Sequence, residues 1–116
     1  MIALPAPVAG VHSVIEVDQR LIEWDRRVVK IRGWMNVCGA GRGTGPFVTQ
    51  RSLCGARSDL PISIPRTVFA ALKSKPVVLR VRGDATCRRY ECTDRYSLLK
   101  FEGVEAVFRA SPKRSN

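Results

Sequence analysis

Apolar and polar residues alternate along residues 26–37, and this alternation constrains the fold more than any other feature of the chain. Val29, Ile31 and Met35 occupy odd positions, while cationic and polar side chains occupy the even ones. A period of two is typical of a β-strand with one buried face. Gly33 interrupts the apolar series, so we expect a bulge or a bend there. The segment therefore predicts a long, half-buried strand.

A second segment repeats this pattern, because residues 28–33 and 78–83 match position by position. Both are predicted to be curved, half-buried strands that end in glycine and carry cations on their outer face. The apolar runs and the turn residues between them predict the remaining elements. We expect strands at residues 47–54, 60–64, 77–86 and 96–108, with Gly103 as a point where the last could break, loops at 39–46 and 87–95, and a short helix at 66–74.

The start of the chain predicts a capped helix. Ser13 and Glu16 have the spacing of a capping box, and apolar residues continue from there at helical spacing as far as Trp24, which we expect in the core. The helix is predicted over residues 14–24. Residues 1–12 are then an extended leader, 13–110 a single domain and 111–116 a basic tail.

The order of these elements resembles that of the OB-fold. The resemblance covers residues 26–108 and depends on the long first strand with Gly33, the helix after Pro65, and the Val-Arg-Gly that ends at Gly83. It implies a mainly β protein: a five-stranded, OB-like Greek-key barrel with an N-terminal helix and a short helix between strands three and four. An SH3-like barrel is the competing architecture, and a helix after its third strand would be unexpected.

The charge of the chain favours an anionic partner. There are 20 Lys and Arg against 10 Asp and Glu, a formal net charge of +10 in 116 residues. Residues 1–25 hold four of the acids and only one cation, so residues 26–116 carry +13. Nucleic acid, an anionic membrane surface or an acidic protein would suit this excess, and solubility alone is the competing explanation. No apolar run approaches the roughly 20 residues that a membrane span needs.

The expected binding site is the outer face of the first and fourth strands. Period two places Arg32 and Trp34 on one face, provided that Gly33 does not bulge. Cations that follow phosphates beside an aromatic ring suit single-stranded nucleic acid or another polyanion. A core role for Trp34 is the alternative, as is a solvated loop for Arg42. The candidate nucleic-acid-binding residues are Lys30, Arg32, Trp34, Arg42, Arg51, Arg80 and Arg82.

The four cysteines lack the paired spacing of a zinc site. If the second strand runs to Cys54, that residue lies about 20 Å from Cys38, at about 3.3 Å per residue. A disulfide between them, which needs Cα atoms within about 7 Å, is then excluded. Cys87 and Cys92 flank a four-residue turn and could form a disulfide. Free thiols in a reducing cytosol are the alternative.

Catalysis is not expected, because the single histidine, His12, lies in the leader and no catalytic set can be assembled around it. No cofactor or metal site is expected either. The leading hypothesis is a non-catalytic module that binds single-stranded nucleic acid. The alternative is an exported or envelope-associated adaptor, stabilised by a disulfide, that binds an acidic protein or a lipid surface. No secretory signal is present, which favours the cytoplasm, and export after removal of a signal is the other possibility.

Overall fold

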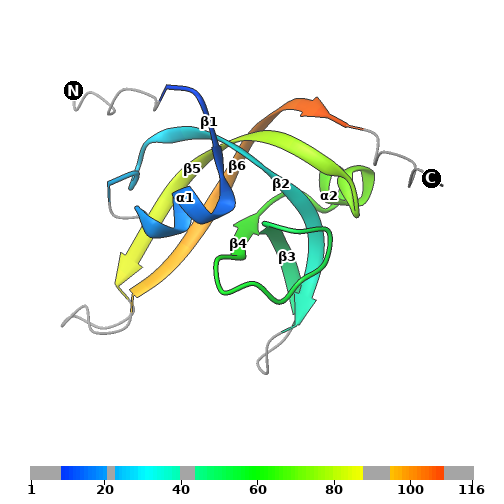
Figure 1. Ribbon diagram of the computed structural model, residues 1–116, viewed down its shortest axis with the longest axis horizontal. Coiled ribbons are helices and arrows are strands. Elements are labelled where there is room, and N and C mark those ends of the chain that lie inside the picture. The colour runs from blue at the N-terminus through cyan, green and yellow to red at the C-terminus, as the bar shows by residue number, and fades with distance from the viewer. Residues whose placement is uncertain (1–8, 21–22, 40–43, 88–94, 109–116) are drawn as a thin grey trace, which may run out of the picture.

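The computed structural model describes residues 9–20, 23–39, 44–87 and 95–108. These residues form one mixed sheet of six strands with two short helices (Figure 1). The mainly β composition predicted from the sequence is therefore confirmed. In chain order the elements are β1 (Val11–Ser13), α1 (Val14–Gln19), β2 (Val28–Gly39), β3 (Thr44–Thr49), β4 (Leu60–Ser63), α2 (Arg66–Leu72), β5 (Pro76–Cys87) and β6 (Arg95–Val107).

The sheet closes into a partial ring of hydrogen-bonded strands. Its order is β1-β2-β3-β4-β6-β5, and an additional pairing joins β5 back to β2. The long strand β2 makes this closure possible, because residues 28–34 pair with β5 while residues 34–39 pair with β3. Figure 1 shows β2 curving between its two partners. The pairs β1–β2 and β4–β6 are parallel, and the other pairs are antiparallel.

Gly33 lies where β2 changes partners, and close packing explains the glycine. A Cβ there would lie 2.7 Å from the Thr49 carbonyl oxygen and 2.9 Å from Val14 Cγ2. Such distances leave no room for any side chain. The register of β2 is continuous against both partners, so the strand bends without a bulge. Arg32 and Trp34 therefore do share the outer face, as predicted.

The repeated pattern of residues 28–33 and 78–83 also has a structural explanation. These segments are antiparallel partners: Val28 pairs with Arg82, and Arg32 pairs with Val78. Their glycines consequently lie at opposite ends of a two-stranded ribbon. A Cβ on Gly83 would lie 2.5 Å from the Trp24 carbonyl oxygen, just as one on Gly33 would contact Val14. The two glycines thus leave room for the two ends of the leading segment, residues 14–24, to pack against the ribbon.

The helix α1 begins as predicted but is shorter than predicted. Ser13 Oγ accepts a hydrogen bond from the Glu16 amide at 3.1 Å, and a Glu16 carboxylate oxygen accepts one from the Ser13 amide at 3.2 Å. The helix ends at Gln19 instead of continuing to Trp24. After the helix, the chain contacts β5, where the Arg26 amide donates a hydrogen bond to the Gly83 carbonyl at 2.8 Å. Trp24 is nevertheless in the core, at 2% exposure.

The core fills the ring and extends under the leading segment. Helix α2 lies between β4 and β5, as predicted, and buries Leu72 with Val68 and Phe69 packed against the core. Strand β1, which the sequence reasoning did not predict, pairs with β2 at residues 30–32. The buried core residues are Val14, Val17, Trp24, Val29, Ile31, Met35, Val48, Leu60, Ile62, Leu72, Val77, Leu79, Val81 and Leu99.

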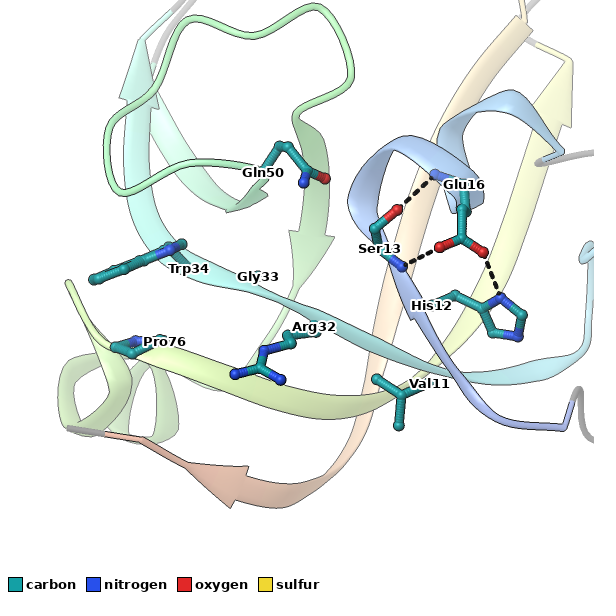
Figure 2. Close-up of a pocket in the computed structure, with 9 residues that line it drawn as sticks. All are labelled: Val11, His12, Ser13, Glu16, Arg32, Gly33, Trp34, Gln50 and Pro76. Carbon is teal, nitrogen blue, oxygen red and sulfur yellow. Dashed lines mark hydrogen bonds and ion pairs between the residues drawn. The ribbon is translucent and has the colours of Figure 1, made fainter. Parts of the chain in front are cut away.

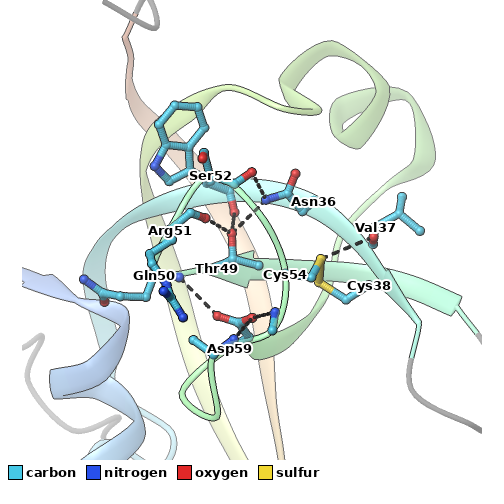
Figure 3. Close-up of a disulfide and its surroundings, with 12 residues drawn as sticks. Asn36, Val37, Cys38, Thr49, Gln50, Arg51, Ser52, Cys54 and Asp59 are labelled. Carbon is cyan, nitrogen blue, oxygen red and sulfur yellow. Dashed lines mark hydrogen bonds between the residues drawn. A yellow bond between two sulfur atoms is a disulfide. The ribbon is translucent and has the colours of Figure 1, made fainter.

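The prediction that Cys38 and Cys54 are too far apart is wrong. They form a disulfide with an S–S distance of 2.11 Å and a Cα–Cα distance of 5.8 Å (Figure 3). The error lies in the second strand, which ends at Thr49 rather than at Cys54. Residues 50–59 then turn back across the outer face of β2, and this brings Cys54 to Cys38. Cys92, and the side chain of Cys87, lie outside the described part of the chain.

Hydrogen bonds made by side chains hold the 50–59 loop in this position. The Asp59 carboxylate accepts hydrogen bonds from the amides of Gln50, Gly55 and Ala56, at 3.2, 2.9 and 3.1 Å. The buried Asn36 amide donates to Thr49 Oγ1 at 2.8 Å and to the Ser52 carbonyl at 3.0 Å (Figure 3). A loop without regular structure thus has its backbone groups satisfied by side chains.

The last strand is irregular but does not break at Gly103. Along β5, the partner on β6 changes from Ala106 to Val104, and further on from Gly103 to Phe101. Each change skips one residue, so Glu105 and Glu102 are the extra residues of two β-bulges. These bulges decide which β6 side chains reach the outer face of the sheet.

Candidate functional site

The predicted cations of β2 and β5 do meet on one face, but glutamates accompany them. Lys30 and Arg80 are direct cross-strand partners. Arg80 Nε lies 2.7 Å from a carboxylate oxygen of Glu105, and Lys30 Nζ lies 4.0 Å from the other. Arg82 Nε donates to Glu102 at 2.7 Å. Two carboxylates therefore offset part of the charge of these three cations.

Sequence reasoning missed both glutamates because their spacing hides them. Glu102 and Glu105 are three residues apart, whereas a regular strand places residues two apart on the same face. The two bulges in β6 bring both carboxylates to the face that carries the cations. Only the pairing register against β5 reveals this arrangement.

Arg32 differs from the other cations on this face. Its side chain is exposed, and within the described residues it makes no ion pair. Its guanidinium carbon lies 4.6 Å from the centre of the Phe108 ring. Phe108 is held there because its amide donates to the Pro76 carbonyl at 2.8 Å. The contact orients the guanidinium and leaves its charge without a counterion in the described ranges.

Trp34 stands beside Arg32 in a cleft of about 450 Å³ on the outer face of β2 (Figure 2). The indole is half-buried. Trp34 on β2 is the direct cross-strand neighbour of Pro76 on β5. Figure 2 shows Trp34 and Pro76 side by side at one end of the cleft, with Arg32 between them and Val11. One end thus offers an aromatic surface with a cation next to it.

The N-terminal segment forms the opposite wall of the cleft. Val11, His12, Ser13 and Glu16 line it, and Gln50 connects it to the loop after β3 by accepting a hydrogen bond from the Ile15 amide at 3.1 Å. From the sequence, Ser13 and Glu16 were predicted only to cap a helix. Their position beside the cleft depends on the parallel pairing of β1 with β2, which no local pattern signals.

Two carboxyl groups of α1 have shifted pKa values. The pKa of Glu16 is lowered, first by its hydrogen bond with His12 and then by the bonds from Ser13. Burial raises the pKa of Asp18, because partial desolvation disfavours the charged form. The Glu16 carboxylate at the wall of the cleft is therefore ionised at neutral pH.

The structure divides the predicted binding residues into groups. Arg32 and Trp34 line the cleft, while Lys30, Arg80 and Arg82 form the ion-paired row beside them. Arg51 is exposed in the 50–59 loop and does not line the cleft. Arg42 lies outside the described residues.

Comparisons with known proteins identify no relative: no family model, curated protein or solved structure matches the chain. Within the described ranges, no helix is long and apolar enough to cross a membrane. In the same ranges, no three His, Cys, Asp or Glu side chains are grouped so that they could hold a metal ion.

Proposed function

We propose that the chain is a non-catalytic OB-type module that binds single-stranded nucleic acid across the outer face of β2. The architecture supports this in two respects. Five of the strands, β2 to β6, form the ring, and α2 lies between the third and the fourth of these, which is the order of elements in an OB-fold. Small barrels of this kind commonly bind oligonucleotides.

The observation that carries the proposal is the pair Arg32 and Trp34 in one cleft. A half-buried indole can stack with a base of any identity, and an adjacent guanidinium can pair with a phosphate of the same strand. Phe108 orients Arg32 before any ligand arrives, which reduces the entropy lost on binding. This combination favours a flexible, single-stranded ligand over a duplex, whose bases are already stacked.

The ion pairs of the neighbouring row limit what those cations contribute. A phosphate that approaches Arg80 or Arg82 must compete with a glutamate at 2.7 Å. We therefore propose Arg32 and Trp34 as the principal contacts, with Lys30, Arg80 and Arg82 in a secondary role. Arg51 and Arg42 are left as candidates for contacts with the strand beyond the cleft.

The test is a titration of a fluorescently labelled 15-residue oligothymidylate at several salt concentrations. We expect the affinity to fall steeply and linearly with salt on logarithmic axes, because each neutralised phosphate releases counterions. A duplex of the same length should bind less tightly than the single strand. Absence of binding to either at about 20 mM salt would reject the proposal.

The disulfide supports a second candidate function, an exported adaptor that binds an acidic protein or a lipid surface. Disulfides persist mainly in oxidising compartments, and Cys38–Cys54 holds an exposed loop that carries Arg51 and Arg57. Mass spectrometry of protein alkylated without reductant, purified from its native cell, tests the redox state. Sedimentation with phosphatidylglycerol vesicles, with phosphatidylcholine vesicles as control, tests the lipid surface. Alkylation of both cysteines together with no vesicle binding would reject this candidate.

A further inference from the structure

His12 contacts hydrogen-bond acceptors through both of its ring nitrogens. Nε2 lies 2.8 Å from the Ala9 carbonyl oxygen, and Nδ1 lies 3.1 Å from a carboxylate oxygen of Glu16. A carbonyl oxygen can only accept a hydrogen bond, and an ionised Glu16 carboxylate can likewise only accept one. For both contacts to be hydrogen bonds, both nitrogens must donate, and only the protonated imidazolium carries a proton on each.

The neutral ring cannot keep both bonds. With its proton on Nε2, it would turn the Nδ1 lone pair towards the Glu16 carboxylate. With the proton on Nδ1, it would turn a lone pair towards the Ala9 carbonyl. Either form loses one contact and places two acceptors against each other. An ordinary imidazole gains and loses this proton between about pH 5 and 8.

This contact lies in the wall of the cleft that carries Arg32 and Trp34 (Figure 2). The charged or ionisable side chains that line the cleft are His12, Glu16 and Arg32. With His12 neutral, Glu16 and Arg32 cancel. With His12 protonated, the lining carries one net positive charge, and Glu16 is engaged by the imidazolium instead of facing the ligand unscreened.

We propose that His12 makes the cleft a pH-dependent anion site, whose affinity for single-stranded nucleic acid rises when His12 is protonated. This inference rests on the proposed function, because it assigns a regulation to the same cleft. Protonation strengthens the contact between β1 and α1, and it adds positive charge beside the cleft.

Apart from Glu16, the contacts and strand pairing of His12 within the described ranges place aromatic, apolar and basic side chains around it. Its ring packs against Trp24, with ring centres 4.9 Å apart, and the Arg20 guanidinium lies 5.6 Å from the Trp24 ring. Across β2, His12 is paired with Ile31, whose neighbours are Lys30 and Arg32. Lysine and arginine remain charged between about pH 5 and 8. Imidazole is the side-chain group that ordinarily titrates in this range, and the chain has a single histidine.

The experiment measures binding of the 15-residue oligothymidylate at pH 5.5 and pH 8.0 at one salt concentration, for the wild type and for His12→Asn. Neither thymine nor phosphodiester titrates between these values, so the probe itself is constant. The wild type should bind about threefold more tightly at pH 5.5, which is the effect expected of one partly screened charge near the ligand. His12→Asn should show nearly equal affinity at both values.

A measurement without ligand keeps the two proposals distinguishable. The amide NMR signals of Ser13 and Glu16 report the contact directly, because both amides belong to the same hydrogen-bonded group. They should shift together between pH 5.5 and 8.0 in the wild type and remain still in His12→Asn. If the oligonucleotide binds at neither pH, the proposed function fails, and the amide shifts still decide the contact. Static amides in the wild type, or a pH effect on binding that survives in His12→Asn, would overturn the inference.

Discussion

The α-carbon of Gly83 faces the backbone carbonyl of Trp24 so closely that a Cβ at position 83 would lie 2.5 Å from that oxygen. The chain makes two hydrogen bonds at the same point: the Arg26 amide donates to the Gly83 carbonyl at 2.8 Å, and the Gly83 amide donates to the Arg27 carbonyl at 3.1 Å. The leading segment is thus attached to the ring at a position that only glycine can occupy.

Gly83→Ala is therefore expected to destabilise the protein. The new methyl group would meet backbone atoms, which cannot turn away as a flexible side chain could, and overpacking of this kind costs about 1–3 kcal/mol. Urea unfolding followed by circular dichroism gives the free energy of unfolding. Gly45→Ala is the matched control, because a Cβ there meets nothing within 4 Å. Equal effects of the two substitutions would contradict the close approach of Gly83 to Trp24.

Loss of the Cys38–Cys54 disulfide should lower stability without changing the fold. The bridge closes a loop between residues 16 apart in sequence, and the loop-entropy model assigns about 3 kcal/mol to a loop of that length. We expect Cys38→Ser with Cys54→Ser to unfold at lower urea concentration and to keep the circular dichroism spectrum of the wild type. Reductant should destabilise the wild type and leave the double variant unchanged. A double variant as stable as the wild type would show that the hydrogen bonds of Asp59 and Asn36 hold the loop by themselves.

Arg32→Ala and Arg80→Ala should affect nucleic-acid binding differently, although they lie on the same face. Arg32 has no ion pair in the described ranges, so its loss should reduce the slope of log affinity against log salt by about one. Arg80 is paired with Glu105 at 2.7 Å, so its loss should reduce the slope by clearly less. Salt titrations with oligothymidylate measure both slopes, with Arg57→Ala as a control away from the cleft. A larger loss for Arg80 than for Arg32 would argue that the ligand displaces Glu105.

Trp34→Ala should weaken binding by roughly 1–3 kcal/mol if a base stacks on the indole. Trp34→Phe should retain much of the affinity, because a smaller ring still offers a stacking surface. Unfolding curves of both variants accompany the binding measurements, since Trp34 is half-buried. A folded Trp34→Ala protein that binds as tightly as the wild type would remove the aromatic contact from the proposed function.

Glu16 should contribute to the loss of stability in acid. Its pKa is lowered in the folded protein, chiefly by His12, from an unfolded value near 4.5. The folded state therefore holds the proton less tightly than the unfolded state does. The stabilisation is present above the unfolded pKa and disappears as pH falls through the folded pKa. Thermal unfolding at pH 6, 4 and 3 should show a smaller decline for Glu16→Gln than for the wild type, and an identical decline would contradict the shift.

Local patterns in the sequence determined most of the secondary structure. Alternation located β2 and the matching part of β5, apolar runs between turn residues located β4 and β6, and the capping residues located the start of α1. These signals depend on neighbours within a few positions. The same alternation placed Arg32 and Trp34 on one face, and that much of the candidate site was predictable.

Only the tertiary structure decided where those elements meet. The turn after Thr49 carries Cys54 back to Cys38, and two bulges in β6 place Glu102 and Glu105 beside the cations of β5. The pairing of β1 with β2 brings His12 to the wall of the cleft. Each relationship joins residues that are at least 16 positions apart, and a register shift of one residue would reverse which face they occupy. The sequence by itself thus determined most of the strands and the cationic face, and the pairing register decided which cation of that face makes no ion pair within the described residues.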